Sequence, residues 1–96
     1  MITAALAMLA ATAATALASH THNNNYSYSE LRESPAGLVI GELGNDTDVA
    51  MVCYTDGPWD GGNYTSNRWF YVYAGSTGGW VHSSFVSDQV SVPACG

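Results

Sequence analysis

From Tyr26 to the C-terminus, the sequence is a series of short runs rich in β-branched and aromatic residues, separated by Gly, Pro, Asn and Asp. No stretch of this region repeats its apolar residues at the spacing of an amphipathic helix. Such runs between turn residues are typical of strands. We predict strands at residues 26–32, 38–43, 47–54, 68–74, 80–82 and 89–92, a polar loop at 55–67 and one helical turn at 83–86. Five or six short strands without a long helix predict an all-β domain, either a small barrel or a sandwich.

The first eighteen residues, MITAALAMLAATAATALA, carry no charge, and fifteen of them are apolar. They end in Ala16-Leu17-Ala18, the small-x-small pattern that precedes a signal-peptide cleavage site. The sequence therefore predicts a signal peptide at residues 1–18 and a secreted protein of the extracellular space or cell envelope, without a membrane span after cleavage. The alternative is a retained membrane anchor, since the run is at the short end of what spans a bilayer.

Removing the first 18 of the 96 residues leaves 78, which is enough for one small domain. Domains of this size usually need a staple in addition to their hydrophobic core. Cys53 and Cys95 form an even pair in a short secreted chain, and this predicts a disulfide. We expect residues 19–25, SHTHNNN, to form a flexible arm and residues 26–96 to form a domain with a disulfide-tethered C-terminal tail.

The charge balance restricts the partners of this chain. Eight carboxylates, two arginines and no lysine give a formal net charge of −6. Nucleic-acid binding needs a basic surface, so nucleic acid is excluded as a partner. Anionic membranes and acidic polymers are disfavoured for the same reason.

Several residue combinations fall short of a metal or catalytic site. His20 and His22 lie in the polar arm without a third ligand nearby, and the acidic residues Glu42, Asp46 and Asp48 lack the spacing of a calcium loop. His82 is followed by Ser83 and Ser84, but residues so close in sequence rarely point at one another, so we expect no catalytic triad. The sequence predicts neither a metal nor a cofactor nor an enzymatic activity.

Five segments, in order, resemble the conserved segments of bacterial SH3 domains (SH3b), in particular the small secreted actinobacterial forms with a cysteine pair. They lie within residues 28–87 and are Leu31-Arg32-Glu33-Ser34-Pro35, Val39-Ile40-Gly41-Glu42-Leu43, Val49 to Cys53, Trp69-Phe70-Tyr71-Val72 with Gly79-Trp80-Val81, and Phe85-Val86. The resemblance implies an SH3-like barrel of five to six strands. It also implies a non-catalytic module that binds the cell wall or partner proteins outside the membrane.

The aromatic strand at residues 68–74 has more apolar side chains than a small barrel can enclose. The resemblance places Val72 inside, and Phe70 with it, because alternate residues share a face. Trp69, Tyr71 and Tyr73 then form a ladder on the outer face. We expect the C-terminal tail, with Val90, Val92 and Pro93, to cover part of this ladder, because exposed ring strips are uncommon. The alternative is an open binding platform.

Trp59 lies in the predicted loop between Pro58 and Asp60, where no local pattern requires it to be buried. Together with Tyr64 it could extend the platform, and Asp56 and Asp60 could pair with a cationic group such as a peptide amine. The opposite interpretation, in which Trp59 folds back as a plug, is equally open. Trp80, in Gly79-Trp80-Val81, is expected to pack structurally.

These expectations predict a secreted, monomeric binding module that recognises a cell-wall peptide or an exported protein. The candidate ligand-binding residues are Trp59, Asp60, Tyr64, Trp69, Tyr71 and Tyr73. One alternative is a small secreted inhibitor or effector of an extracellular enzyme. Another is a structural domain without a ligand, in which tail and loop cover every ring.

Overall fold

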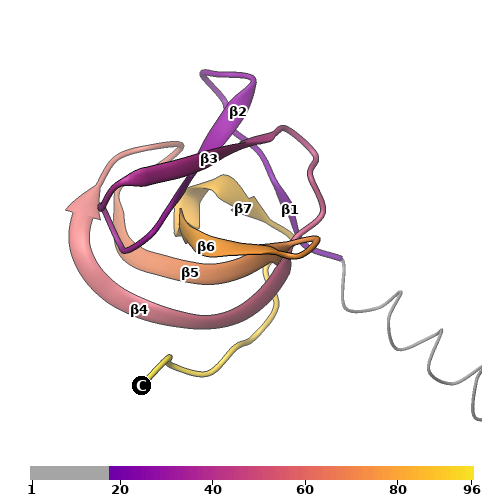
Figure 1. Cartoon of the computed structure of the whole chain (residues 1–96). Helices are drawn as coiled ribbons and strands as arrows, with labels where there is room; N and C mark the ends of the chain where they lie inside the picture. The colour runs from indigo at the N-terminus through magenta and orange to yellow at the C-terminus, as the bar shows by residue number, and fades with distance from the viewer. Residues whose placement is uncertain (1–17) are drawn as a thin grey trace, which may run out of the picture.

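The computed structural model describes residues 18–96, so the predicted signal peptide lies outside the described residues except for Ala18. The described chain is all-β, as predicted (Figure 1). Its elements are β1 (His20–Thr21), β2 (Tyr28–Arg32), β3 (Val39–Gly44), β4 (Ala50–Asp60), β5 (Ser66–Ala74), β6 (Thr77–His82), a 3₁₀ turn (Ser83–Phe85) and β7 (Val86–Ser87). Within residues 18–96, no helix is long and apolar enough to cross a membrane.

The strands form two antiparallel sheets. The larger one has the strand order β3-β2-β6-β5-β4, and the smaller one pairs β1 with β7. The long strands β4 and β5 curve together around one side of the molecule, and the β2–β3 hairpin crosses the opposite side (Figure 1). Because β3 and β4 are edge strands, hydrogen bonding does not close the large sheet into a barrel.

The core lies on the concave side of the large sheet and is made of few side chains. Phe70 and Val72 of β5 are both buried there, as expected from their shared face. The other buried members are Leu31, Val49, Val81 and Val86. A Cβ atom at Gly79 would lie 2.6 Å from Cγ of Leu31, so the glycine of Gly79-Trp80-Val81 is needed for the close approach of β6 to β2.

The prediction of a loop at residues 55–67 is wrong for most of its length. β4 continues to Asp60 and β5 begins at Ser66, so only residues 61–65 form the turn. Polar cross-strand pairs hold this extension together. The Arg68 guanidinium donates to Asp56 Oδ1 at 2.8 Å and lies 3.9 Å from the centre of the Tyr54 ring. The turn-forming residues of this segment led to the prediction of a loop. The strand forms nevertheless, because an ion pair and a cation–π contact stabilise it in place of alternating apolar side chains.

The Asp56–Arg68 pair leads to a pH prediction. The hydrogen bond from Arg68 holds the pKa of Asp56 below its ordinary value of 3.8. A lowered folded-state pKa means that the pair contributes stability above the unfolded-state pKa and loses this contribution as the pH falls through the folded-state pKa. Because both side chains are at the surface, the change in stability is small. An NMR titration of Asp56 in the wild type and in Arg68→Gln measures the effect. The variant's pKa should return towards 3.8, and an unchanged value would contradict the assignment.

Residues 19–25 do not form the predicted flexible arm. Ser19, Thr21 and Asn23 are buried, and β1 pairs with β7. Hydrogen bonds satisfy the polar side chains in place of water. Asn23 Oδ1 accepts from the backbone of Asn25 at 2.9 Å, and Thr21 Oγ1 donates to the carbonyl of Gly44 at 3.0 Å. Hydropathy does not reveal such a segment, because its burial rests on specific partners.

The predicted disulfide between Cys53 and Cys95 is present, with a Cα–Cα distance of 4.9 Å. A disulfide is typical of proteins from oxidising environments. The predicted strand at residues 89–92 is absent. The tail instead runs along the outer edge of β4, where Tyr54 N–H donates to Pro93 O at 3.0 Å and Cys95 N–H donates to Tyr54 O at 2.9 Å. The tail therefore covers a strand edge, and its Val92 packs against the core.

Candidate functional site

Five of the six predicted site residues fall into two groups. Trp59 and Asp60 end β4 and Tyr64 lies in the β4–β5 turn; all three are exposed, Trp59 to 70%. Tyr71 and Tyr73 lie on the outer face of β5, Tyr71 half-buried and Tyr73 exposed. Tail and loop therefore do not cover every ring, and Trp59 is not a plug.

Trp69 does not belong to the exposed ladder, which corrects the expectation from strand alternation. Its side chain faces away from Phe70, but it is only 1% exposed. The extended end of β4 passes over it, and the indole N–H donates to the carbonyl of Pro58 at 2.9 Å. The His82 ring packs edge-on against the indole, with 4.9 Å between ring centroids. A second, smaller buried cluster thus exists on the outer side of the sheet.

The remaining rings form a row that includes Trp80. Tyr71 packs edge-on against Tyr73 at 5.5 Å and against Trp80 at 5.4 Å between centroids. Gly78 lies beneath the two tyrosines, and a Cβ there would be 2.4 Å from the Tyr71 hydroxyl. A hydrogen bond with Tyr73 raises the pKa of Tyr71 above its ordinary value of 10. The rings are tilted against each other, so this row is a ridged surface and not a flat platform.

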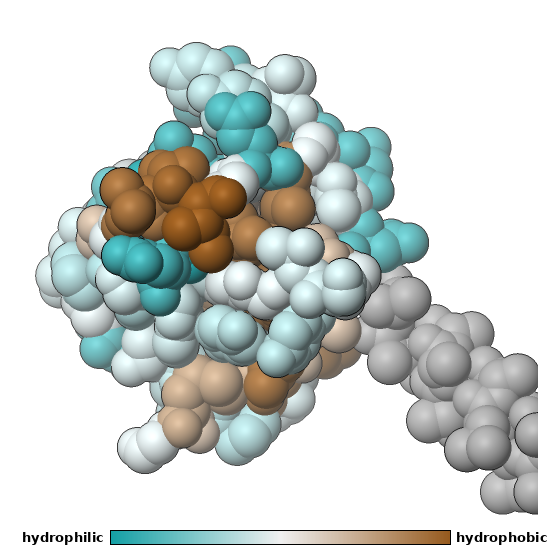
Figure 2. Space-filling model, viewed as in Figure 1, coloured by the Kyte–Doolittle hydropathy of each residue, from teal (hydrophilic) through white to brown (hydrophobic). Residues whose placement is uncertain are grey.

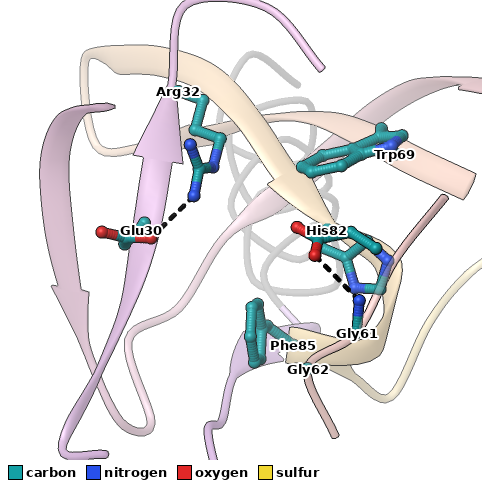
Figure 3. Close-up of a pocket in the computed structure, with 8 residues that line it drawn as sticks. Glu30, Arg32, Gly61, Gly62, Trp69, His82 and Phe85 are labelled. Atoms are coloured by element: carbon teal, nitrogen blue, oxygen red, sulfur yellow. Dashed lines mark hydrogen bonds and ion pairs between the residues drawn. The ribbon is translucent and has the colours of Figure 1, made fainter. Parts of the chain in front are cut away.

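A pocket of about 230 Å³ opens between β2 and the β4–β5 turn. In Figure 3, Glu30 and Arg32 from β2 stand on one side of it, and Trp69 and His82 stand on the other. Its full lining is Glu30, Arg32, Asp60, Gly61, Gly62, Trp69, His82 and Phe85. Of the candidate residues, Asp60 lies at this pocket and Trp69 forms its wall. Glu30, Arg32 and Phe85 were missed as site residues, although the resemblance included the segments that contain Arg32 and Phe85.

His82 and Ser84 do point at one another, contrary to expectation. His82 Nδ1 lies 2.7 Å from Ser84 Oγ, and Nε2 lies 2.9 Å from the carbonyl oxygen of Ser66. Since a carbonyl only accepts, Nε2 carries a proton and Nδ1 is left to accept from Ser84. Ser84 Oγ in turn accepts from the Asn63 backbone N–H at 3.1 Å. The 3₁₀ turn brings these two near neighbours into contact. Through the bond from Asn63 to Ser84, the pair holds the β4–β5 turn in place.

The charged side chains at the pocket differ in how many of their atoms are paired inside the protein. Arg32 donates to Glu30 Oε1 and to the carbonyl of Gly37, both at 2.7 Å, which fixes its guanidinium group. Asp60 Oδ1 accepts from the Gly61 N–H at 2.8 Å. Among residues 18–96, Asp60 has no ion-pair partner. The pocket therefore combines a ring-lined wall with one unpaired carboxylate and one carboxylate that is paired through a single oxygen.

A second pocket of about 260 Å³ shares Glu30 and Phe85 with the first and is otherwise lined by Asn23, Tyr26 and Tyr28. The two pockets are therefore neighbours along one face. Tyr26 and Tyr28 pack with 6.0 Å between ring centroids, and Tyr26 is exposed. The sequence did not predict this part of the site, because Asn23 was assigned to a flexible arm. We call the two pockets together the binding groove.

An apolar patch of Leu38, Val39 and Ile40 lies at the start of the edge strand β3, where Figure 2 shows a large hydrophobic area. Leu38 is 66% exposed. None of the three residues lines either pocket of the groove. The patch is therefore separate from the candidate site.

Within the part of the chain that the structure describes, no group of three or more His, Cys, Asp or Glu side chains could hold a metal ion. Comparisons with protein-family models, with curated proteins and with solved structures find no match. The resemblance to bacterial SH3 domains is accordingly carried by the sequence segments alone.

Proposed function

We propose that this chain is a secreted, non-catalytic binding module of the SH3b type, which recognises a cell-wall peptide or a segment of an exported protein. The 3₁₀ turn directly before the last short strand agrees with the helical turn expected at residues 83–86. A five-stranded antiparallel sheet accompanied by a short two-stranded one supports an all-β module of this kind, in which hydrogen bonding leaves the large sheet open. The disulfide supports export.

The binding groove, together with the exposed Trp59 that precedes the lining residue Asp60 in the chain, is the observation that carries this proposal. Each pocket is smaller than the roughly 300–1,000 Å³ typical of sites that enclose a drug-sized ligand. Two small adjoining pockets suit an extended chain that places successive side chains in them. The exposed ring of Tyr26, which lines the second pocket, offers an apolar face for such a chain and a polar tip for its backbone. The exposed ring of Trp59, next to Asp60 in the chain, offers a second such surface.

Pull-down of the mature protein on purified bacterial sacculi tests the proposal. We expect Trp59→Ala to weaken the affinity for sacculi roughly tenfold, because a ring contact with its buried area contributes about 1–2 kcal/mol. Tyr73→Ala is the matched control, since Tyr73 is also an exposed ring but pairs with Ala50 at the opposite end of the β4–β5 hairpin from Trp59. If neither the wild type nor the variants bind sacculi, the cell-wall ligand is wrong.

A second candidate function is inhibition of an extracellular enzyme. The observation that favours it is the high exposure of Trp59 next to the β4–β5 turn, since a single large ring on a hairpin suits insertion into a partner's cleft. Binding to an exported hydrolase without binding to sacculi would select this function over the first. In both cases we expect the free protein to be a monomer.

A further inference from the structure

We propose that the first pocket of the groove binds a primary ammonium group carried by a peptide, whether on a lysine side chain or at a free amino terminus. This inference rests on the proposed function, because it names the chemical class that the same groove selects. It follows from the pocket's carboxylates, its ring-lined wall and its size.

The carboxylates give the pocket its charge preference. Asp60 is exposed and has no ion pair within residues 18–96, and only its Oδ1 takes part in a hydrogen bond there. Glu30 uses Oε1 for Arg32, and its second oxygen makes no hydrogen bond in the same region. With Arg32 the only cation in the lining, the formal charge of the pocket is negative. The net charge of −6 adds a field that attracts cations to the whole molecule.

Arg32 does not turn the pocket into an anion site. Its Nη1 is bound to the Gly37 carbonyl and its Nη2 to Glu30, both at 2.7 Å, so the guanidinium is held by partners inside the fold. A ligand carboxylate would have to compete with Glu30 for it and would meet Asp60 nearby. A ligand ammonium group gains from both carboxylates without displacing any internal hydrogen bond.

The wall opposite β2 suits the rest of such a group. The half-buried Phe85 presents its ring to the pocket, and the buried rings of His82 and Trp69 form the wall behind it, with centroid distances of 5.9 Å from His82 to Phe85 and 4.9 Å from His82 to Trp69. Both ring nitrogens of His82 are engaged with Ser66 and Ser84, so His82 offers the ligand no free donor or acceptor. Ring faces attract ammonium groups and also pack against methylene chains. The carboxylates are therefore the polar partners of the pocket, and the rings are its apolar ones.

The size of the pocket limits the ligand to one side chain or one terminus. A volume of about 230 Å³ holds a short chain of methylene groups with its ammonium head. The adjoining pocket, which shares Glu30 and Phe85, would take the next residue of the same peptide. In Figure 3, Glu30 on β2 and Phe85 on the 3₁₀ turn stand at separate positions around the pocket, and both also line the adjoining one.

Three small probes test the inference on the mature, disulfide-bonded protein by ¹H–¹⁵N NMR titration. Nα-acetyl-lysine methylamide carries a side-chain ammonium group, triglycine amide carries a terminal one, and Nα,Nε-diacetyl-lysine methylamide carries none. We expect at least one ammonium probe to shift the amide signals of Gly61, Gly62 and Phe85, and the diacetylated probe to leave them in place. The probe that binds identifies the source of the group. Equal shifts with all three probes, or with none, would overturn the inference.

Charge-removing variants locate the effect. Asp60→Asn keeps the side-chain oxygen that accepts from Gly61 and should weaken the binding of the ammonium probe at least fivefold. The matched control is Asp46→Asn, which removes the same charge at an exposed turn residue that does not line the groove. The spectrum of each variant shows directly whether it is folded. Equal affinities in the wild type and in a folded Asp60→Asn would refute the role of the carboxylate.

The inference and the proposed function can fail separately. Binding to sacculi that depends on Trp59 but is unchanged by Asp60→Asn, and by acetylation of sacculus amines, would leave the function standing and remove the ammonium site. Binding of an ammonium probe at Gly61 and Gly62, without any binding to sacculi, would remove the cell-wall ligand and keep the site.

Discussion

Replacing Trp69 with alanine is expected to lower the free energy of unfolding by about 3–5 kcal/mol, the cost of removing a large buried aromatic ring. The indole is only 1% exposed and lies between the end of β4 and the ring of His82. Its N–H bond to Pro58 O at 2.9 Å would also be lost, and the carbonyl would have to find water. Small domains have total stabilities of about 5–15 kcal/mol, so the loss would remove a large fraction of the stability of this domain.

Chemical denaturation followed by far-UV circular dichroism measures the loss, and Trp59→Ala provides the matched control. Both substitutions remove a tryptophan, but Trp59 is 70% exposed and its loss should change the free energy of unfolding by less than about 0.5 kcal/mol. The two variants therefore separate a structural ring from a candidate binding ring. Equal stability of both variants would show that the β4 extension does not bury Trp69 in solution.

Trp69 also shows where the sequence was informative about the aromatic strand. Alternation along β5 correctly placed Phe70 and Val72 in the core. Successive side chains of a strand point to opposite faces, and only one face of this sheet encloses the core. Alternation alone could not place Trp69. Its burial depends on Gly57 and Pro58 folding over the outer face, and those residues have the composition of a loop. The outer face of a strongly curved sheet can thus be covered by its own neighbouring strand.

The binding groove was predictable only in part, for a related reason. Asp60 was recognisable in the sequence as a charged residue beside a tryptophan that no local pattern required to be buried. Asn23 and Tyr26 reach the groove because the segment near the N-terminus hydrogen-bonds to distant partners, such as the Asn23 backbone N–H to Asn45 Oδ1 at 2.9 Å. Such pairings depend on the tertiary structure and leave no periodic pattern in the sequence. The all-β class and the disulfide, by contrast, followed from local composition and from cysteine count.

Removing the disulfide with the double variant Cys53→Ser/Cys95→Ser is expected to lower the free energy of unfolding by about 4 kcal/mol. The two cysteines are 42 residues apart, and the cross-link restricts the unfolded chain in proportion to the logarithm of that loop length. The folded state loses a contact as well, since the bridge holds the tail against the outer edge of β4. Urea denaturation of the oxidised protein and of the double variant gives the difference directly.

Hydrogen exchange distinguishes this global effect from local release of the tail. The Tyr54 amide donates to Pro93 O in the tail, whereas the amides within the β5–β6 pairing belong to the interior of the large sheet. If the bridge acts mainly on the unfolded chain, Tyr54 and the β5–β6 amides should lose protection together, by the same free energy. If it merely pins the tail, Tyr54 alone would exchange faster, and the exposed β4 edge would then favour association between molecules. An unchanged denaturation midpoint together with unchanged Tyr54 protection would contradict both roles, because the backbone bonds to Pro93 and Cys95 would then hold the tail without the sulfur bridge.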